Sequence, residues 1–121
     1  MRVLIVDDEL DLQEAIREAL ESEGHGTACA SNGREALERL RTGEPTCVIL
    51  LDLSMPVMDG WEFRQHQLDD DALADIPVVL ITADGNASEK ARKMSAHGFL
   101  RKPIRPGDLL DTVLGFCPQT S

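Results

Sequence analysis

Short apolar runs alternate with longer amphipathic segments along the whole of this chain. The first, third and fourth runs are nearly continuous valine, isoleucine and leucine, which is the pattern of parallel strands buried on both faces of a sheet. The second run is weaker and fits a more exposed strand. The five predicted strands are Val3–Val6, Thr27–Ala30, Cys47–Leu51, Val78–Thr82 and Phe99–Leu100.

The segments between the runs carry apolar residues at helical spacing. The clearest has Leu12, Ile16 and Leu20 on one face and is predicted to end near Gly24. The second predicted helix begins with a cap at Asn32 or a close neighbour and ends around residue 43. The remaining helices are predicted near residues 60–68, over roughly 87–96 and over about 106–115.

Strict alternation of strand and helix predicts a parallel sheet with right-handed crossovers and helices on both faces. The expected fold is therefore a three-layer αβα domain of the α/β class. A chain of 121 residues fits one domain, which we place over residues 1–118 with a tail at 119–121.

The charge balance excludes several classes of function. There are 12 basic and 22 acidic residues, a formal net charge of −10, which argues against direct binding to nucleic acid. The apolar runs are too short to span a bilayer, and acidic groups occupy the start of the chain, where a signal peptide would be apolar. We therefore expect a cytoplasmic protein that contacts no membrane.

Cys29, Cys47 and Cys117 are odd in number and far apart, so we expect reduced thiols, with Cys29 and Cys47 as small core side chains.

The residues that follow the predicted strands are polar and chemically complementary. In an open α/β sheet, ligands bind beyond the carboxyl ends of the strands, so these residues would face one crevice. They are Asp7, Asp8 and Glu9 after the first strand, Asp52 after the third, Thr82 at the end of the fourth and Lys102 after the fifth.

Three aspartates at one edge repel each other, and the common remedies are protonation or a bound cation. Ligands that are all oxygen favour Mg²⁺ or Ca²⁺, and Mg²⁺ suits a partly open site because it keeps several waters. A lysine at position 102 would pair with Asp52, and Thr82 would donate a hydrogen bond to a bound anion. Capping of the next helix is an alternative role for Asp8, whereas Asp52 lies well before the next predicted helix and caps nothing obvious.

Four segments resemble, in order and spacing, the signatures of the receiver domains of two-component response regulators. They are Val6-Asp7-Asp8-Glu9, Leu51-Asp52-Leu53-Ser54-Met55-Pro56-Val57-Met58-Asp59-Gly60, Ile81-Thr82-Ala83 and Leu100-Arg101-Lys102-Pro103. The resemblance extends over essentially the whole chain. It implies a doubly wound, flavodoxin-like sheet of five parallel strands in the order 2-1-3-4-5.

The resemblance also implies how the carboxylates work. A partner histidine kinase or phosphotransfer protein would phosphorylate Asp52, whose carboxylate is the nucleophile of an in-line phosphoryl transfer. Lys102 and Thr82 would bind the phosphoryl oxygens, and the Lys102-Pro103 peptide bond is expected to be cis. Mg²⁺ would be held by Asp7, Asp8, Asp52 and the backbone carbonyl of Ser54. Of the first two, Asp8 is expected to be the direct ligand.

By the same resemblance, phosphorylation changes a surface of the domain. Thr82 would move toward the phosphoryl group and Phe99 would rotate from exposed to buried, while the face formed by the fourth helix, fifth strand and fifth helix repacks. A plain core aromatic is the alternative for Phe99. Ser54 and Asp84 stand at the positions that tune the lifetime of the phosphoryl group, and Asp84 would orient a hydrolytic water. A solvated loop carboxylate is the alternative for Asp84.

The expected function is a signalling switch that catalyses only its own phosphorylation and dephosphorylation and is otherwise not an enzyme. It would pass the signal to a downstream protein target and exist as a monomer or weak dimer. A pseudo-receiver, which keeps the fold as an interaction module without phosphorylation, is the alternative. A flavin-binding carrier would need a phosphate loop of opposite charge after the first strand, and an aspartate-dependent phosphatase would place its carboxylates at alternate positions, whereas Asp7 and Asp8 are adjacent.

Overall fold

The computed structural model of the protein describes residues 1–43 and 45–118, and in this part of the chain five strands alternate with five helices. The predicted tail, 119–121, lies outside the described residues. The strands are β1 (Arg2–Val6), β2 (Gly26–Ala30), β3 (Thr46–Asp52), β4 (Val78–Thr82) and β5 (Gly98–Arg101). The helices are α1 (Leu10–Ser22), α2 (Gly33–Thr42), α3 (Gly60–Leu68), α4 (Ala87–Lys93) and α5 (Pro106–Phe116).

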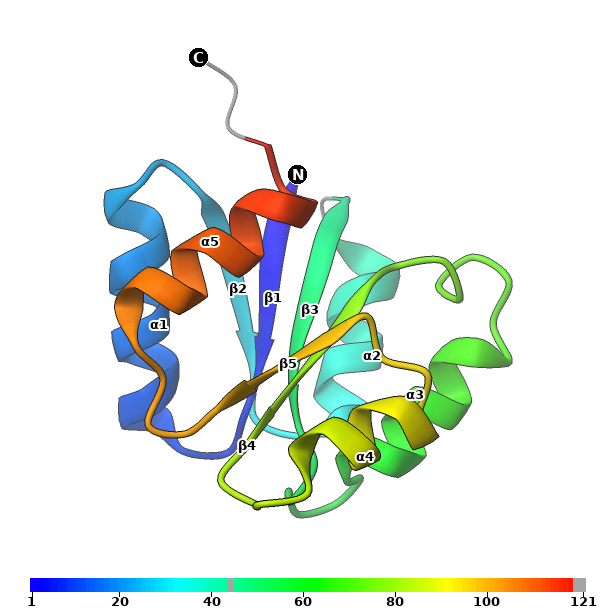
Figure 1. Ribbon diagram of the computed structural model, residues 1–121. Helices are drawn as coiled ribbons and strands as arrows, with labels where there is room; N and C mark the ends of the chain where they lie inside the picture. The colour runs from blue at the N-terminus through cyan, green and yellow to red at the C-terminus, as the bar shows by residue number, and fades with distance from the viewer. Residues whose placement is uncertain (44, 119–121) are drawn as a thin grey trace.

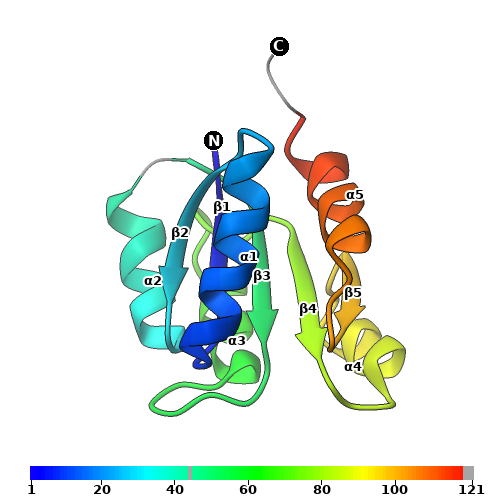
Figure 2. The same ribbon diagram turned by 90° about the vertical axis from the view of Figure 1, so that its left-hand side faces the viewer.

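The strands form one parallel sheet in the order β2-β1-β3-β4-β5. Helices α1 and α5 cover one face, and α2, α3 and α4 cover the other (Figures 1 and 2). The sheet order and the three layers confirm the predicted αβα fold. They also bring the carboxyl ends of all the strands to the same edge of the molecule.

Alternate residues of each inner strand supply two separate cores. On β1, Val3 and Ile5 pack toward α1 and α5, while Leu4 and Val6 pack toward α2 and α3, and all four side chains are fully buried. This is why the run lacks polar alternation: a strand with helices on both sides has no face in contact with water. Phe63 of α3 is also fully buried, in the second of these cores.

The helix starts follow local capping chemistry. The Asn32 side chain accepts a hydrogen bond from the Glu35 amide at 2.9 Å, which confirms the predicted cap of α2. Helix α4 is shorter than predicted: it ends at Lys93, because the chain turns into a left-handed conformation at Ser95, where φ is 57°. The Lys102-Pro103 peptide bond is cis, as the resemblance implied.

A buried arginine holds the far end of α4. Arg64 of α3 is only 4% exposed, and its guanidinium donates to the carbonyls of Met94 (3.0 Å) and Ser95 (2.8 Å). A third bond, at 2.7 Å, goes to Gln67, whose amide in turn binds the loop before β4. Burial lowers the pKa of the Arg64 guanidinium. These bonds satisfy carbonyls at the end of a helix and so set where α4 lies relative to α3.

The loop between β3 and α3 folds back tightly on the end of the strand. A side chain at Gly60 would lie 2.6 Å from the Asp52 carbonyl oxygen and 2.8 Å from the Leu53 Cα, so only glycine fits there. Within this loop Val57 is left-handed, with φ of 68°, which is unfavourable for a β-branched residue.

The structure corrects the expectation that all three cysteines are reduced, because Cys47 and Cys117 form a disulfide. The reason is a local irregularity that apolar patterning does not reveal. Strand β1 pairs Arg2 with Thr46 but Val3 with Val48, so Cys47 is an extra residue at a bulge. Its side chain thereby joins the core under α5, where Cys117 ends the helix.

Candidate functional site

The predicted strand-end residues meet at the carboxyl edge of the sheet. A cleft of about 330 Å³ opens there. It lies where β1, β3, β4 and β5 end, at the lower edge of the sheet in Figure 1. Its lining includes Asp8, Asp52, Ser54, Thr82, Asp84 and Lys102.

Three of these strand-end residues form an acidic cluster. One carboxylate oxygen from each of Asp7, Asp8 and Asp52 lies within 4.8 Å of the others. Asp7 is fully buried and Asp52 is 7% exposed, whereas Asp8 faces the solvent of the cleft. Asp8 does not cap helix α1, because Glu9 occupies the N-cap position.

Lys102 lies between the carboxylates. Its Nζ is 3.0 Å from an Asp7 oxygen, 3.6 Å from Glu9 and 3.7 Å from an Asp52 oxygen. Its side chain is only 16% exposed, so these charges interact at lower effective dielectric than at an open surface. Three carboxylates, those of Asp7, Glu9 and Asp52, therefore share one ammonium group.

The electrostatics of the cleft shift both central groups. The pKa of Asp52 is raised from 3.8 to about 6, mainly by burial and then by the neighbouring charges of Asp7 and Asp8, against the opposing effects of Lys102 and the Ser54 amide. Burial alone would lower the pKa of Lys102, but its contact with Asp7 and the charges of Asp52 and Glu9 outweigh it, so the Lys102 pKa is raised. Asp52 thus carries an excess of unfavourable charge that a further cation would relieve.

The oxygen atoms present fit a divalent cation. Asp7 Oδ2 is buried and makes an ion pair with Lys102 Nζ at 3.0 Å, and no other donor among the described residues reaches it. A buried carboxylate oxygen with a single cationic neighbour, beside two further carboxylates, is a donor set for a hard cation such as Mg²⁺. Ser54 is exposed and lines the same cleft.

Thr82 ends β4 with its side chain at the cleft. Its hydroxyl oxygen accepts a hydrogen bond from the Asp84 amide at 3.1 Å, which leaves the hydroxyl hydrogen free to be donated. The Asp84 carboxylate is paired with Lys90 of α4. Phe99 on β5 is 40% exposed, so it is not the plain core aromatic that was one alternative.

Sequence reasoning gave one residue near the site no role and missed another. Glu9, which was expected at the crevice without a role, contributes a third carboxylate to Lys102. Lys90 reaches Asp84 from α4, six residues along the chain, and this contact depends on how α4 packs, for which the sequence offers no signal.

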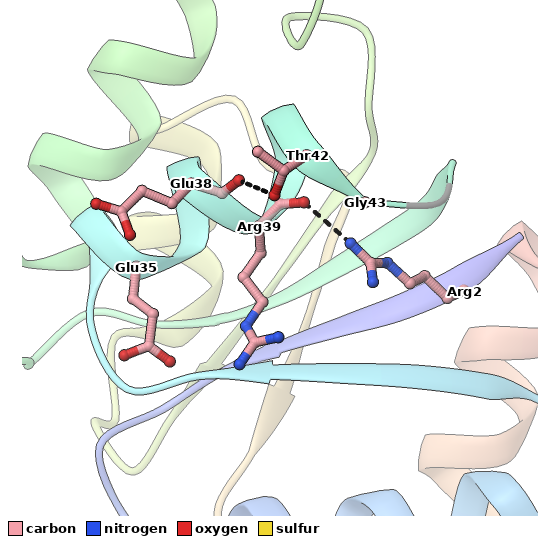
Figure 3. A pocket seen from close by; sticks show the side chains of 6 residues that line it. All are labelled: Arg2, Glu35, Glu38, Arg39, Thr42 and Gly43. Atoms are coloured by element: carbon pink, nitrogen blue, oxygen red, sulfur yellow. Dashed lines mark hydrogen bonds between the residues drawn. The ribbon is translucent and has the colours of Figure 1, made fainter.

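A second hollow, of about 390 Å³, lies along α2 beside Arg2 (Figure 3). The Arg2 guanidinium there donates to the Arg39 carbonyl at 3.0 Å, in the last turn of α2. Two arginines and the carboxylates of Glu35 and Glu38 line it, so its formal charge is balanced. A side chain at Gly43 would lie 1.8 Å from Arg2 Nη2, so this hollow is the place where Arg2 packs against the end of a helix.

No helix within residues 1–43 and 45–118 has the length and apolar character needed to cross a membrane.

Related sequences and structures agree on the family. Response regulator MprA of Mycolicibacterium vanbaalenii is 34% identical over 124 residues, covering 100% of this chain and 52% of the relative. The chain spans about half the length of the curated relatives it matches. Chemotaxis response regulator CheY4 of Vibrio cholerae superposes with a TM-score of 0.85 at 30% identity, covering 95% of this chain and 97% of that one.

A third match comes from a different kind of protein. The signal receiver domain of a signal transduction histidine kinase from Syntrophus aciditrophicus has a TM-score of 0.83 at 30% identity and covers 99% of this chain and 94% of its own. The family model described as "Response regulator receiver domain" matches residues 3–114. The strand order, the acidic edge with its lysine and these matches together place the chain in the response regulator receiver domain family.

Proposed function

We propose that this receiver domain is a phosphoacceptor and that Asp52 takes the phosphoryl group from a histidine kinase or a phosphotransfer protein. The observation that carries the proposal is the position of Asp52, which is nearly buried at the cleft and lies within reach of two further aspartates and of Lys102. A side chain with only a structural role would not need this concentration of unfavourable charge.

The transfer itself makes modest demands on the protein. An oxygen of the Asp52 carboxylate attacks phosphorus, the bond between phosphorus and the donor nitrogen breaks, and the donor histidine recovers a proton from solvent. Asp7, Asp8, Asp52 and the backbone carbonyl of Ser54 would hold Mg²⁺, with Asp8 contributing directly because it faces the cleft. The ion would neutralise phosphoryl charge during transfer.

Lys102 and Thr82 would bind the product. Lys102 Nζ is 3.7 Å from an Asp52 oxygen and would pair with a phosphoryl oxygen once the carboxylate carries the phosphoryl group. The Thr82 hydroxyl has a free hydrogen for a second oxygen. Both hydrogen bonds form only when Asp52 is phosphorylated. They would therefore stabilise the arrangement of β4 and β5 in which their geometry is most favourable.

Phe99 is the residue through which that rearrangement would reach the surface. It is 40% exposed on β5, beside α4. Movement of Thr82 toward the phosphoryl group would leave room for Phe99 to turn inward and would repack the surface made by α4, β5 and α5. A downstream protein would recognise this surface in one state and not the other.

Asp84 would tune how long the phosphoryl group lasts, together with Ser54. The Asp84 amide is bound to Thr82 and its carboxylate is held by Lys90, so a carboxylate oxygen is kept near the cleft. Replacing Asp84 with alanine should slow hydrolysis about 2- to 10-fold, the loss expected for one hydrogen bond to water. An unchanged rate would remove Asp84 from the mechanism.

Partners follow from the proposed chemistry. Relatives include a transcriptional regulator, a chemotaxis protein and a histidine kinase domain, so the downstream target is a protein of unspecified class. The net charge of −10 argues against nucleic acid as a direct target of this chain. We propose a cytoplasmic monomer or weak dimer.

The test is phosphorylation by acetyl phosphate. The protein and its Asp52→Asn variant are incubated with acetyl phosphate and MgCl₂, and intact mass is followed, with Asp111→Asn as a control that removes an exposed carboxylate of α5. Gain of one phosphoryl group by the wild type and the control, lost on chelation of the metal and not seen for Asp52→Asn, supports the proposal. No gain, under conditions that modify a known receiver, would indicate a pseudo-receiver that binds its partner constitutively.

A further inference from the structure

The disulfide between Cys47 and Cys117 lies at the end of the molecule opposite the acidic cleft. It joins the start of β3 to the end of α5, two segments that meet at the end of the molecule where β1 begins (Figure 1). The two residues are 70 apart in sequence, yet their Cα atoms are 5.5 Å apart, a normal separation for a disulfide. Nothing in the chemistry of the phosphoacceptor site uses this pair.

The fold brings the two sulfur atoms together by independent means. On β3 the bulge at Cys47 turns its side chain toward the core beneath α5. On α5, Leu109, Val113 and Cys117 follow each other at intervals of four residues and face the sheet. Both cysteines are nearly buried, at 6% and 5% exposure. The pairing is therefore built into two elements of the fold and is not a contact between mobile surface groups.

The same site also offers a hydrogen-bond acceptor to a reduced Cys47. Cys47 Sγ lies 3.3 Å from the Arg2 carbonyl oxygen, an acceptor that a Cys47 thiol would use once the disulfide is open. A cysteine thiol is a small apolar group and suits the core around Cys117. Cys29, the one free cysteine among the described residues, lies on β2, and burial raises the pKa of its thiol, which disfavours the reactive thiolate.

We propose that Cys47 and Cys117 are a reversible thiol–disulfide site through which this domain responds to the oxidation state of low-molecular-weight thiols. Oxidation proceeds by exchange with a disulfide such as oxidised glutathione. One cysteine sulfur attacks it, forms a mixed disulfide and releases one glutathione thiol; the second cysteine then attacks the mixed disulfide, closes the protein disulfide and releases the second glutathione thiol. Reduction is the reverse, with two thiols consumed and one disulfide formed.

The element that responds is the last turn of α5. In the oxidised protein this turn is covalently tied to β3. In the reduced protein it is held by packing, including the edge-on contact of Phe116 with the ring of His97, whose centroids are 6.3 Å apart. Fraying of that turn exposes Cys117 and gives a reductant access to the buried disulfide. Since α5 belongs to the proposed output surface, an effect on signalling would rest on the proposed function, but the redox site itself does not.

The experiment is a redox titration of the native protein in mixtures of reduced and oxidised glutathione. Samples are quenched by acid, denatured and alkylated with iodoacetamide, and the intact mass is measured by mass spectrometry. Each free cysteine then adds one label. We expect three labels at the reducing limit and one at the oxidising limit, the remaining label mapping to Cys29. Cys29→Ser is the matched control and should still lose two labels on oxidation, whereas Cys47→Ser and Cys117→Ser should not form the intramolecular disulfide.

A second readout follows the structural consequence. Amide hydrogen exchange at residues 113–117 should slow by about tenfold or more in the oxidised protein, with exchange in α1 as the internal reference. Uptake of a phosphoryl group from acetyl phosphate is measured in parallel, so failure of the phosphoacceptor proposal is distinguished from failure of this one. Three outcomes would overturn the redox site: full labelling of Cys47 and Cys117 in excess oxidised glutathione, a disulfide that resists excess reductant in the folded protein, or identical exchange of α5 in both forms.

Discussion

Replacing Asp52 with asparagine should change how the stability of the metal-free protein depends on pH. Asp52 is 7% exposed, and burial beside Asp7 raises its pKa from 3.8 to about 6 in the folded protein. The folded state therefore holds the Asp52 proton more tightly than the unfolded state does. Stability from this group is fully present below about pH 4 and is lost as pH rises through about 6, because the unfolded state then binds fewer protons than the folded one.

The magnitude follows from the shift. A rise from 3.8 to about 6 is roughly two units, and each unit corresponds to about 1.4 kcal/mol, so ionising Asp52 costs the folded protein about 3 kcal/mol at neutral pH. Roughly half of that is lost between about pH 5 and about pH 7.5. Asparagine has no proton to release and should not show this loss.

The assay is urea denaturation in the presence of a chelator at several pH values. Relative to wild type, Asp52→Asn should gain about 1.4 kcal/mol in its free energy of unfolding between about pH 5 and about pH 7.5. Asp111→Asn serves as the control, since it removes an exposed carboxylate that does not line the cleft and should follow the wild type. Adding Mg²⁺ at the higher pH should stabilise the wild type and leave Asp52→Asn nearly unchanged. Parallel pH curves for wild type and Asp52→Asn would show that Asp52 is not destabilised by its surroundings.

Three further substitutions test the framework around the site by urea denaturation. Gly60→Ala should destabilise by about 2 kcal/mol or more, because its methyl group meets the Asp52 backbone at 2.6 Å, whereas Gly107→Ala, with open space around it, should be neutral or stabilising; equal effects would be inconsistent with this crowding. Val57→Gly should stabilise by about 1 kcal/mol, since the position is left-handed and 72% exposed, and a loss of stability would contradict the assigned strain. Arg64→Met should cost about 3 kcal/mol by leaving two carbonyls unsatisfied, and a cost below about 0.5 kcal/mol would show that water replaces the guanidinium.

The elements themselves were readable from the sequence, because each is encoded by neighbours along the chain. The run Val3–Val6 has no polar alternation, which requires burial on both faces, and Asn32 precedes its helix with a side chain suited to capping. The same reasoning located Asp52 and Lys102 at strand ends. Once strands alternate with helices, parallel order follows, and the strand ends meet at one edge of the sheet.

Only the tertiary structure determined certain contacts. In these contacts the partners lie far apart in sequence, or their meeting depends on how one helix packs. The bulge that turns Cys47 toward α5 leaves no trace in apolar patterning, and so the pairing with Cys117 could not be foreseen. The bonds of Arg64 to the end of α4 and the reach of Lys90 to Asp84 depend in the same way on where α4 packs. Local sequence specifies backbone conformation and burial through short-range sterics and hydrophobicity, whereas the position of one element against another is set by the packing of many side chains together.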